Sequence, residues 1–189
     1  MENNLIMENF ALDKTTSLLI IDIQERLIKA LEEPVSAGLI RYTSILTQLA
    51  VDVGSSIFFS EQYPKGLGHT VEELSDLLKS AGATSFEKTY FDLCACDTFM
   101  PQSLSKTVIV CGMETHICVL STVLSLLSRG HRVLLPIDAV ASRSIQNYEN
   151  GLKLMEKAGA ILINSETLVF QTLKHSKSDH FKKYSKLIL

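Results

Sequence analysis

The chain has 189 residues, of which 46% are hydrophobic, so it is long enough to bury the core of a single domain. Its net charge of −3 gives no reason to expect nucleic acid or an anionic membrane as a partner. No apolar run is long enough to cross a bilayer, and no positively charged leader precedes an apolar segment. Four cysteines do not form the disulfide framework of a small secreted protein, so we expect a reducing, cytoplasmic location.

Short apolar runs alternate with longer amphipathic segments, and this pattern predicts β-α-β units around a parallel sheet. The predicted strands cover residues 17–23, 56–60, 84–87, 107–111, 132–137 and 160–163. The predicted helices lie within 34–54, over 71–78, after Cys118 and over about 147–158. Thr70 and Glu73 have the spacing of a capping box at the start of the second helix.

We therefore predict an α/β fold with three α-β-α layers and a doubly wound, six-stranded, mostly parallel sheet. One domain should span residues 1–189, with its core over about 12–175 and with flexible termini. The lysines at 182, 183 and 186 favour a solvated C-terminal tail. A ligand site is expected beyond the carboxyl ends of the strands, where the strand order reverses.

Three polar residues fall near those strand ends: Asp22 closes the first strand, Lys88 comes just past the third and Cys118 follows the fourth. An aspartate inside an apolar run needs a partner, and a lysine supplies one. In this arrangement Asp22 exchanges a proton with the thiol, while Lys88 and the start of the helix lower the thiol pKa. The thiolate would attack an electrophilic carbon, and backbone N–H groups of Glu114 and Cys118 would stabilise the oxyanion.

Each of the three residues also has a simple structural interpretation when it is taken alone. A cysteine among apolar residues is usually part of a core, an aspartate at a strand end often caps a loop, and most lysines are exposed. Only their joint placement favours chemistry. Gln24, Gln62, Tyr63 and Phe91 are candidates for substrate binding, and each has an ordinary loop or packing role as its alternative.

Four motifs, in this order, resemble the isochorismatase-like cysteine hydrolase superfamily: LIIDIQ at 19–24, FEKTYFD at 86–92, GMETHICV at 112–119 and DAVAS at 138–142. The resemblance covers nearly the whole chain. It implies a catalytic triad of Asp22, Lys88 and Cys118, a cis peptide bond between Met113 and Glu114, and a homo-oligomer.

The chain departs from the nicotinamidases of that superfamily, which carry an Asp-x-His and a further histidine after the second strand as metal ligands. Here the corresponding residues at 60–64 are SEQYP, and His69 alone lacks the converging ligands that zinc requires. We therefore expect neither a metal nor another cofactor. The segment 61–68 resembles the metal-independent branch of isochorismatase domain-containing proteins.

The leading hypothesis is a cysteine hydrolase that acts on a small amide, imide or ester-like metabolite through a covalent thioester. The alternative is a binding or scaffold protein, or a redox sensor at Cys118, that keeps the hydrolase fold without catalysis. A dinucleotide-binding fold is disfavoured because no G-x-G-x-x-G follows the first strand.

Overall fold

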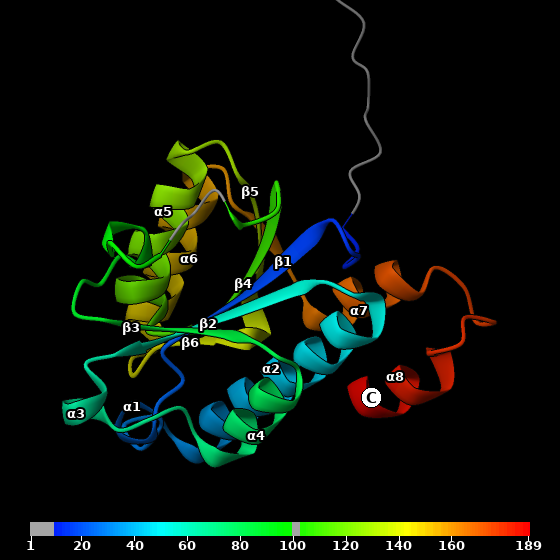
Figure 1. Ribbon diagram of the computed structural model, residues 1–189, viewed down its shortest axis with the longest axis horizontal. Coiled ribbons are helices and arrows are strands. Elements are labelled where there is room, and N and C mark those ends of the chain that lie inside the picture. The colour runs from blue at the N-terminus through cyan, green and yellow to red at the C-terminus, as the bar shows by residue number, and fades with distance from the viewer. Residues whose placement is uncertain (1–9, 100–102) are drawn as a thin grey trace, which may run out of the picture.

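The computed structural model describes residues 10–99 and 103–189, and its centre is a parallel sheet between two layers of helices (Figure 1). The strand order is β3-β2-β1-β4-β5-β7, and the short strand β6 pairs with β4. The strands are β1 (Thr16–Ile21), β2 (Ser56–Gln62), β3 (Thr84–Lys88), β4 (Thr107–Met113), β5 (Arg132–Pro136), β6 (Val140–Ala141) and β7 (Ile161–Ile163). The predicted fold class is confirmed, with β6 as one strand more than the sequence indicated, because two residues are too few to show a pattern.

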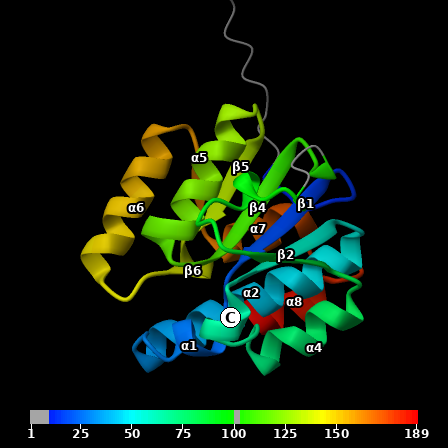
Figure 2. The ribbon, with the colours of Figure 1, turned by 60° about the vertical axis from the view of Figure 1, so that its left-hand side comes forward.

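Strand β1 is buried on both faces because its side chains alternate between two hydrophobic cores. Leu18 and Ile20 enter the core under helices α2 (Glu33–Val53), α4 (Glu72–Ser80), α7 (Ser165–Leu173) and α8 (Phe181–Ile188). Leu19 and Ile21 enter the core under α5 (Leu120–Ser128) and α6 (Ile145–Lys157), and Figure 2 shows the two helical layers on opposite faces of the sheet. None of the helices in the described part of the chain has both the length and the apolar character needed to cross a membrane.

The order of the sheet reverses at β1, which pairs with β2 on one side and β4 on the other. Ile21, its last residue, is in register with Ser60 of β2 and Gly112 of β4. The residues that follow these positions therefore meet at one edge of the sheet. This is the place where a doubly wound fold forms its ligand site.

The predicted capping box at Thr70 is wrong. Helix α4 begins at Glu72, its N-cap is Val71, and no side chain caps it. The backbone N–H and hydroxyl of Thr70 instead donate to the Glu61 carboxylate, over 2.6 and 2.8 Å. The Thr70 hydroxyl, which the sequence pattern predicted to cap α4, is therefore hydrogen-bonded to Glu61 of β2 instead.

The C-terminal segment that we predicted to be a solvated tail is helix α8, packed on α2. Tyr184 is fully buried, and its hydroxyl donates to Asp52 on α2 over 2.6 Å. Lys183 also donates to Asp52, over 2.7 Å. The expected flexible N-terminus lies outside the described residues over positions 1–9.

Candidate active site

Asp22 and Lys88 form an ion pair at the carboxyl edge of the sheet. Asp22 follows β1 with a left-handed backbone (φ 52°), a conformation that aspartate adopts more readily than most residues. Lys88 ends β3, and its Nζ lies 2.6 Å from Asp22 Oδ2, with both side chains 0% exposed. The Ser60 hydroxyl donates to the other carboxylate oxygen over 2.6 Å. The pair therefore has a fixed geometry, which the register of three strands imposes.

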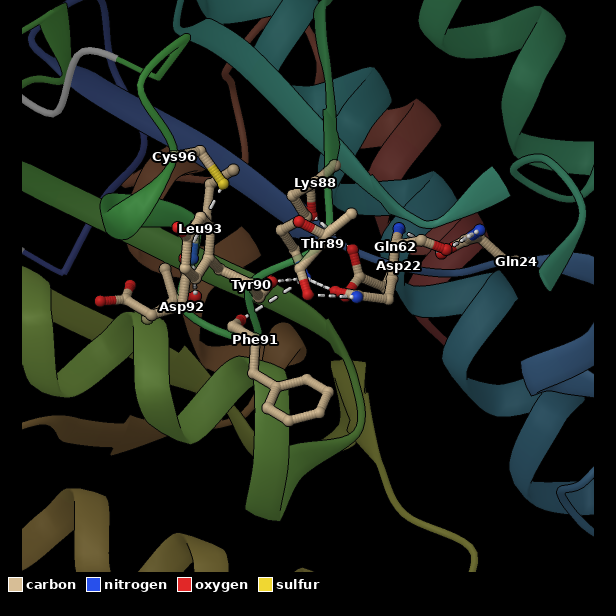
Figure 3. Close-up of polar contacts among 12 residues, drawn as sticks. Asp22, Gln24, Gln62, Lys88, Thr89, Tyr90, Phe91, Asp92, Leu93 and Cys96 are labelled. Carbon is tan, nitrogen blue, oxygen red and sulfur yellow. Dashed lines mark hydrogen bonds and ion pairs between the residues drawn. The ribbon is translucent and has the colours of Figure 1, made fainter. Parts of the chain in front are cut away.

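Lys88 has further acceptors at the end of β2 and on the loop that follows β3 (Figure 3). Its ammonium donates to Gln62 Oε1 over 2.7 Å, and to the carbonyl oxygens of Tyr90 and Phe91 over 3.3 and 3.4 Å. A buried charge is tolerated when it is paired and its remaining donors are satisfied. Lys88 meets both conditions: it is paired with Asp22, and its other donors have acceptors.

Cys118 lies in the turn that joins β4 to α5. This turn, Thr115–Val119, is a π-helix, and the Cys118 side chain is buried. Burial and the negative charge of Asp22 raise the pKa of the thiol to about 12, against the opposing effect of Lys88. The expected lowering of the pKa is therefore wrong, because desolvation and Asp22 outweigh Lys88.

The backbone before Cys118 has two unusual features. Gly112 has φ 125°, and a β-carbon there would lie 2.0 Å from the carbonyl oxygen of Ile21, so no other residue fits. The Met113–Glu114 peptide bond is cis, at the position that the resemblance implied. The Glu114 carboxylate accepts from Arg143 Nε over 2.5 Å and from Arg143 Nη2 over 3.4 Å. His116 Nε2 is 3.6 Å from the same carboxylate.

A cavity of about 270 Å³ opens over Cys118. Apolar side chains form much of its wall: Leu27, Ala30, Leu67, Phe91 and Ile117. Its polar members besides the cysteine are Arg26, Gln62, Glu114 and Arg143. This volume is slightly below the roughly 300–1,000 Å³ of pockets for drug-sized ligands, which suits a small metabolite.

Of the four residues predicted to bind substrate, Gln62 and Phe91 line this cavity. Gln24 does not, because its amide is bonded to the backbone of Gln62 in both directions and to the carbonyl of Gly68. Tyr63 lines a separate cavity of about 390 Å³, on the side of Lys88 that bears Cys96. Gln24 thus holds the loops of the site together, and Tyr63 lies outside the Cys118 cavity.

Sequence reasoning missed three polar residues of the site: Ser60, Arg26 and Arg143. Ser60 could have been found, since it ends a predicted strand beside the one that carries Asp22. Arg26 lies four residues after Asp22, and Arg143 directly follows the DAVAS motif. Neither arginine lies in a pattern that indicates a function, and only the fold brings both to the Cys118 cavity.

Other polar residues singled out from the sequence have structural contacts. Asp138 accepts from the backbone N–H and hydroxyl of Ser165, at the start of α7. His116 Nδ1 lies 3.0 Å from the Ser142 hydroxyl. Within residues 10–99 and 103–189, no three His, Cys, Asp or Glu side chains gather as metal ligands would.

The fold and this crevice define the chain as a three-layer α/β protein with a buried cysteine at the carboxyl edge of a parallel sheet. The family model described as the isochorismatase domain matches residues 16–167. The chain belongs to the isochorismatase family, which confirms the resemblance in the four motifs.

Two curated relatives agree with this assignment. Isochorismatase family protein 1A of Dictyostelium discoideum is 39% identical, over 67% of this chain and 64% of that protein. The chain thus spans a little less than two thirds of that relative's length. Isochorismatase domain-containing protein 2 of Xenopus laevis is 32% identical, over 94% of this chain and 85% of that protein.

Solved structures show the same fold. A Caenorhabditis elegans protein described as MAR1 ribonuclease superimposes with a TM-score of 0.82 at 35% identity, over 94% of this chain and 92% of that chain. The Escherichia coli YcaC product, described as an octameric hydrolase of unknown specificity, superimposes with a TM-score of 0.80 over 94% of each chain. At 19% identity, the second likeness concerns the fold alone.

Proposed function

We propose that the protein is a cysteine hydrolase that cleaves a small amide, imide or ester-like metabolite through a covalent thioester. One observation carries the proposal: the Cys118 thiol lies beside the buried Asp22–Lys88 pair, close enough for both charges to act on its pKa, and it lines a small cavity. A cysteine with a purely structural role needs neither an adjacent buried ion pair nor a neighbouring cavity. The family assignment supports hydrolysis without identifying a substrate.

Asp22 acts as the general base in this mechanism. With a pKa of about 12, the thiol is neutral in the free protein at pH 7, so it must lose its proton as it attacks. The Asp22 carboxylate lies close enough to the thiol to act on its pKa, and it receives that proton. Lys88 keeps the Asp22 carboxylate oriented and stabilises the negative charge that develops on sulfur.

Attack on the carbonyl carbon forms a carbon–sulfur bond and moves an electron pair onto the carbonyl oxygen. We propose that the backbone N–H groups of Glu114 and Cys118 bind this oxyanion. The tetrahedral intermediate then expels an amine or alcohol, which takes the proton from Asp22. Water attacks the remaining thioester with Asp22 again as base, releasing the carboxylic acid and restoring the thiol.

Substitution of Cys118 tests the proposal. Cys118→Ala should lower turnover by at least about 1,000-fold in a screen of small amides, imides and esters, because it removes the nucleophile. Cys94→Ala is the matched control, since Cys94 is also a buried cysteine but lies on the short turn Leu93–Ala95 and does not line the Cys118 cavity. Equal turnover by the parent and Cys118→Ala would show that another group performs the reaction.

The same screen addresses the alternative functions. RNA should be added to the screen as a test compound, because a similar structure is described as a ribonuclease. The net charge of −3 does not favour RNA binding. A redox sensor needs a low-pKa, accessible thiol, whereas burial and Asp22 raise the pKa of Cys118. No turnover on any substrate, together with a stable partner recovered from cells, would instead favour a scaffold.

We also propose that the protein forms a homo-oligomer. Large apolar side chains are exposed on both helical layers, among them Val35, Ile145 and Leu154. One structural neighbour is described as octameric. Light scattering coupled to size-exclusion chromatography measures the assembly directly, and a mass of 21.0 kDa would show a monomer.

The cytoplasm is the location that we propose. All four cysteines are free and buried, as expected of a chain that folds under reducing conditions. Fractionation of cells with an antibody against the chain tests this placement, and recovery in a secreted fraction would contradict it.

A further inference from the structure

The charges on the wall of the Cys118 cavity do not balance. Three charged side chains line it: Arg26, Glu114 and Arg143. Arg143 is engaged with Glu114 through two hydrogen bonds, so these two charges cancel. The Asp22–Lys88 pair beneath the cysteine cancels in the same way. Among the charged side chains that line the cavity, the positive charge of Arg26 is therefore not compensated.

Arg26 has no carboxylate partner of its own among residues 10–99 and 103–189. It lies on the short helix α1 (Glu25–Ile28), is solvent-exposed, and forms no ion pair or hydrogen bond within the described structure. The acid nearest in sequence, Glu25, does not line the cavity. The guanidinium therefore offers free donors at a cavity whose apolar side chains supply no competing acceptor.

We infer that the substrate carries a carboxylate and that Arg26 binds it while Cys118 attacks an acyl group at the other end. The inference rests on the proposed hydrolase function and adds the chemical class of its substrate. A planar guanidinium binds a carboxylate through two parallel hydrogen bonds. In about 270 Å³ the carbon chain between the two groups must be short, and Leu27, Leu67 and Ile117 provide apolar contacts for it.

Monoamides of short dicarboxylic acids are suitable probes. Malonamate, succinamate and glutaramate each have a neutral counterpart of nearly the same shape, the diamide, in which the carboxylate is replaced by a carboxamide. Binding is measured by calorimetry or ligand-observed NMR on Cys118→Ala, which prevents turnover. At least one monoamide should bind about tenfold more tightly than its diamide at low ionic strength.

Variants of α1 assign this preference to Arg26. Arg26→Gln should remove the roughly tenfold difference, and Arg26→Lys should keep part of it, because lysine retains the charge without the two-pronged geometry. Lys29→Gln is the matched control: it removes the same charge from an exposed residue next to the same helix, away from the cavity wall. Raising the salt concentration should weaken the preference, since the guanidinium is exposed.

Equal binding of monoamide and diamide, no binding of any probe, or a preference that survives Arg26→Gln would each overturn the inference. These outcomes differ from failure of the hydrolase proposal, which is turnover that persists in Cys118→Ala. In the otherwise unmodified protein, Arg26→Gln should raise KM for the monoamide with little change in kcat, because Arg26 binds a group remote from the reacting bond.

Discussion

At the scale of single residues, burial and Asp22 together set the state of Cys118. The Asp22 carboxylate is held by Lys88 and Ser60, and its negative charge adds to burial in raising the pKa of the adjacent thiol. The same carboxylate is the base that we propose for the reaction. In the proposed mechanism the Cys118 thiol is therefore protonated at rest and loses its proton only during attack.

Because of this double role, Asp22→Asn should change the alkylation rate of Cys118 and the turnover rate in opposite directions. Removing the charge should lower the Cys118 pKa, because the effect of Asp22 disappears and that of Lys88 remains. Alkylation of Cys118 by iodoacetamide at pH 7 should then become faster, roughly tenfold for each unit by which the pKa falls. Turnover should nevertheless be lost, since the amide cannot accept the proton. Mass spectrometry of the labelled peptide, alongside an activity assay, measures both effects.

Glu87→Gln serves as the control for that experiment, because Glu87 is exposed and precedes Lys88 on the same strand. Glu87→Gln should change neither the alkylation rate of Cys118 nor the turnover rate appreciably. In the parent, the alkylation rate should rise with pH up to at least 9, without a plateau near 7, as a pKa of about 12 requires. Slower labelling of Asp22→Asn than of the parent would contradict the charge arrangement.

The three candidate catalytic residues could be predicted because each lies at, or within a few residues after, the carboxyl end of a predicted strand. The direction of the shift in the Cys118 pKa could not, since it depends on the depth of burial and on how close the Asp22 charge lies. Arg26 and Arg143 were missed for another reason. They belong to segments more than 100 residues apart, and only the packing of the loops places them around one cavity.

At the scale of elements, the junction between β4 and its helix determines where Cys118 lies. Gly112 ends the ladder beside Ile21 of β1 and allows the two backbones to approach closely. The chain then passes through the cis bond after Met113 into the π-helical turn that carries Cys118. The sequence indicates a strand, a glycine and a helix here, but the π turn has no recognisable residue pattern.

Gly112→Ala should be strongly destabilising. The added β-carbon would meet the Ile21 carbonyl oxygen at 2.0 Å, and the main chain on both sides is buried, so relief requires the strands to separate. We expect a loss of about 3 kcal/mol or more in the free energy of unfolding, measured by urea denaturation.

Gly82→Ala separates backbone strain from the clash. Gly82 also has a positive φ, of 65°, but a β-carbon there would have no atom within 4 Å. Its substitution should cost about 1 kcal/mol, the usual penalty for a left-handed alanine. Equal costs at the two positions would show that the close approach of β1 and β4 contributes nothing.

At the scale of the whole molecule, the C-terminal helix completes one of the two cores. Phe181, Tyr184 and Ile188 recur at helical spacing, a signal that was present in the sequence but was obscured by the lysines between them. The partner of Tyr184 could not be predicted, because Asp52 is 132 residues away. The sheet and its crevice follow from local patterns, whereas the attachment of α8 depends on this distant contact.

The attachment should depend on pH through Asp52. Burial raises the pKa of Asp52, but hydrogen bonds from Lys183 and Tyr184 outweigh it, so the pKa lies below the ordinary 3.8. A carboxylate with a lowered pKa stabilises the folded state above pH 3.8, and this contribution is lost as pH falls through the folded-state value. Asp52→Asn keeps an acceptor for Tyr184 and removes only the charge. It should therefore cost about 1 kcal/mol at pH 7.

Urea denaturation of the parent and Asp52→Asn between pH 7 and pH 3 measures this dependence. The difference in unfolding free energy should be constant down to about pH 5 and should shrink below pH 4, as the parent carboxylate becomes protonated. Asp179→Asn, at an exposed position just before α8, should show no such difference at any pH. A gap of equal size at pH 3 and pH 7 would mean that the Asp52 charge does not stabilise α8, and that the apolar contacts of Phe181 and Ile188 hold it in place.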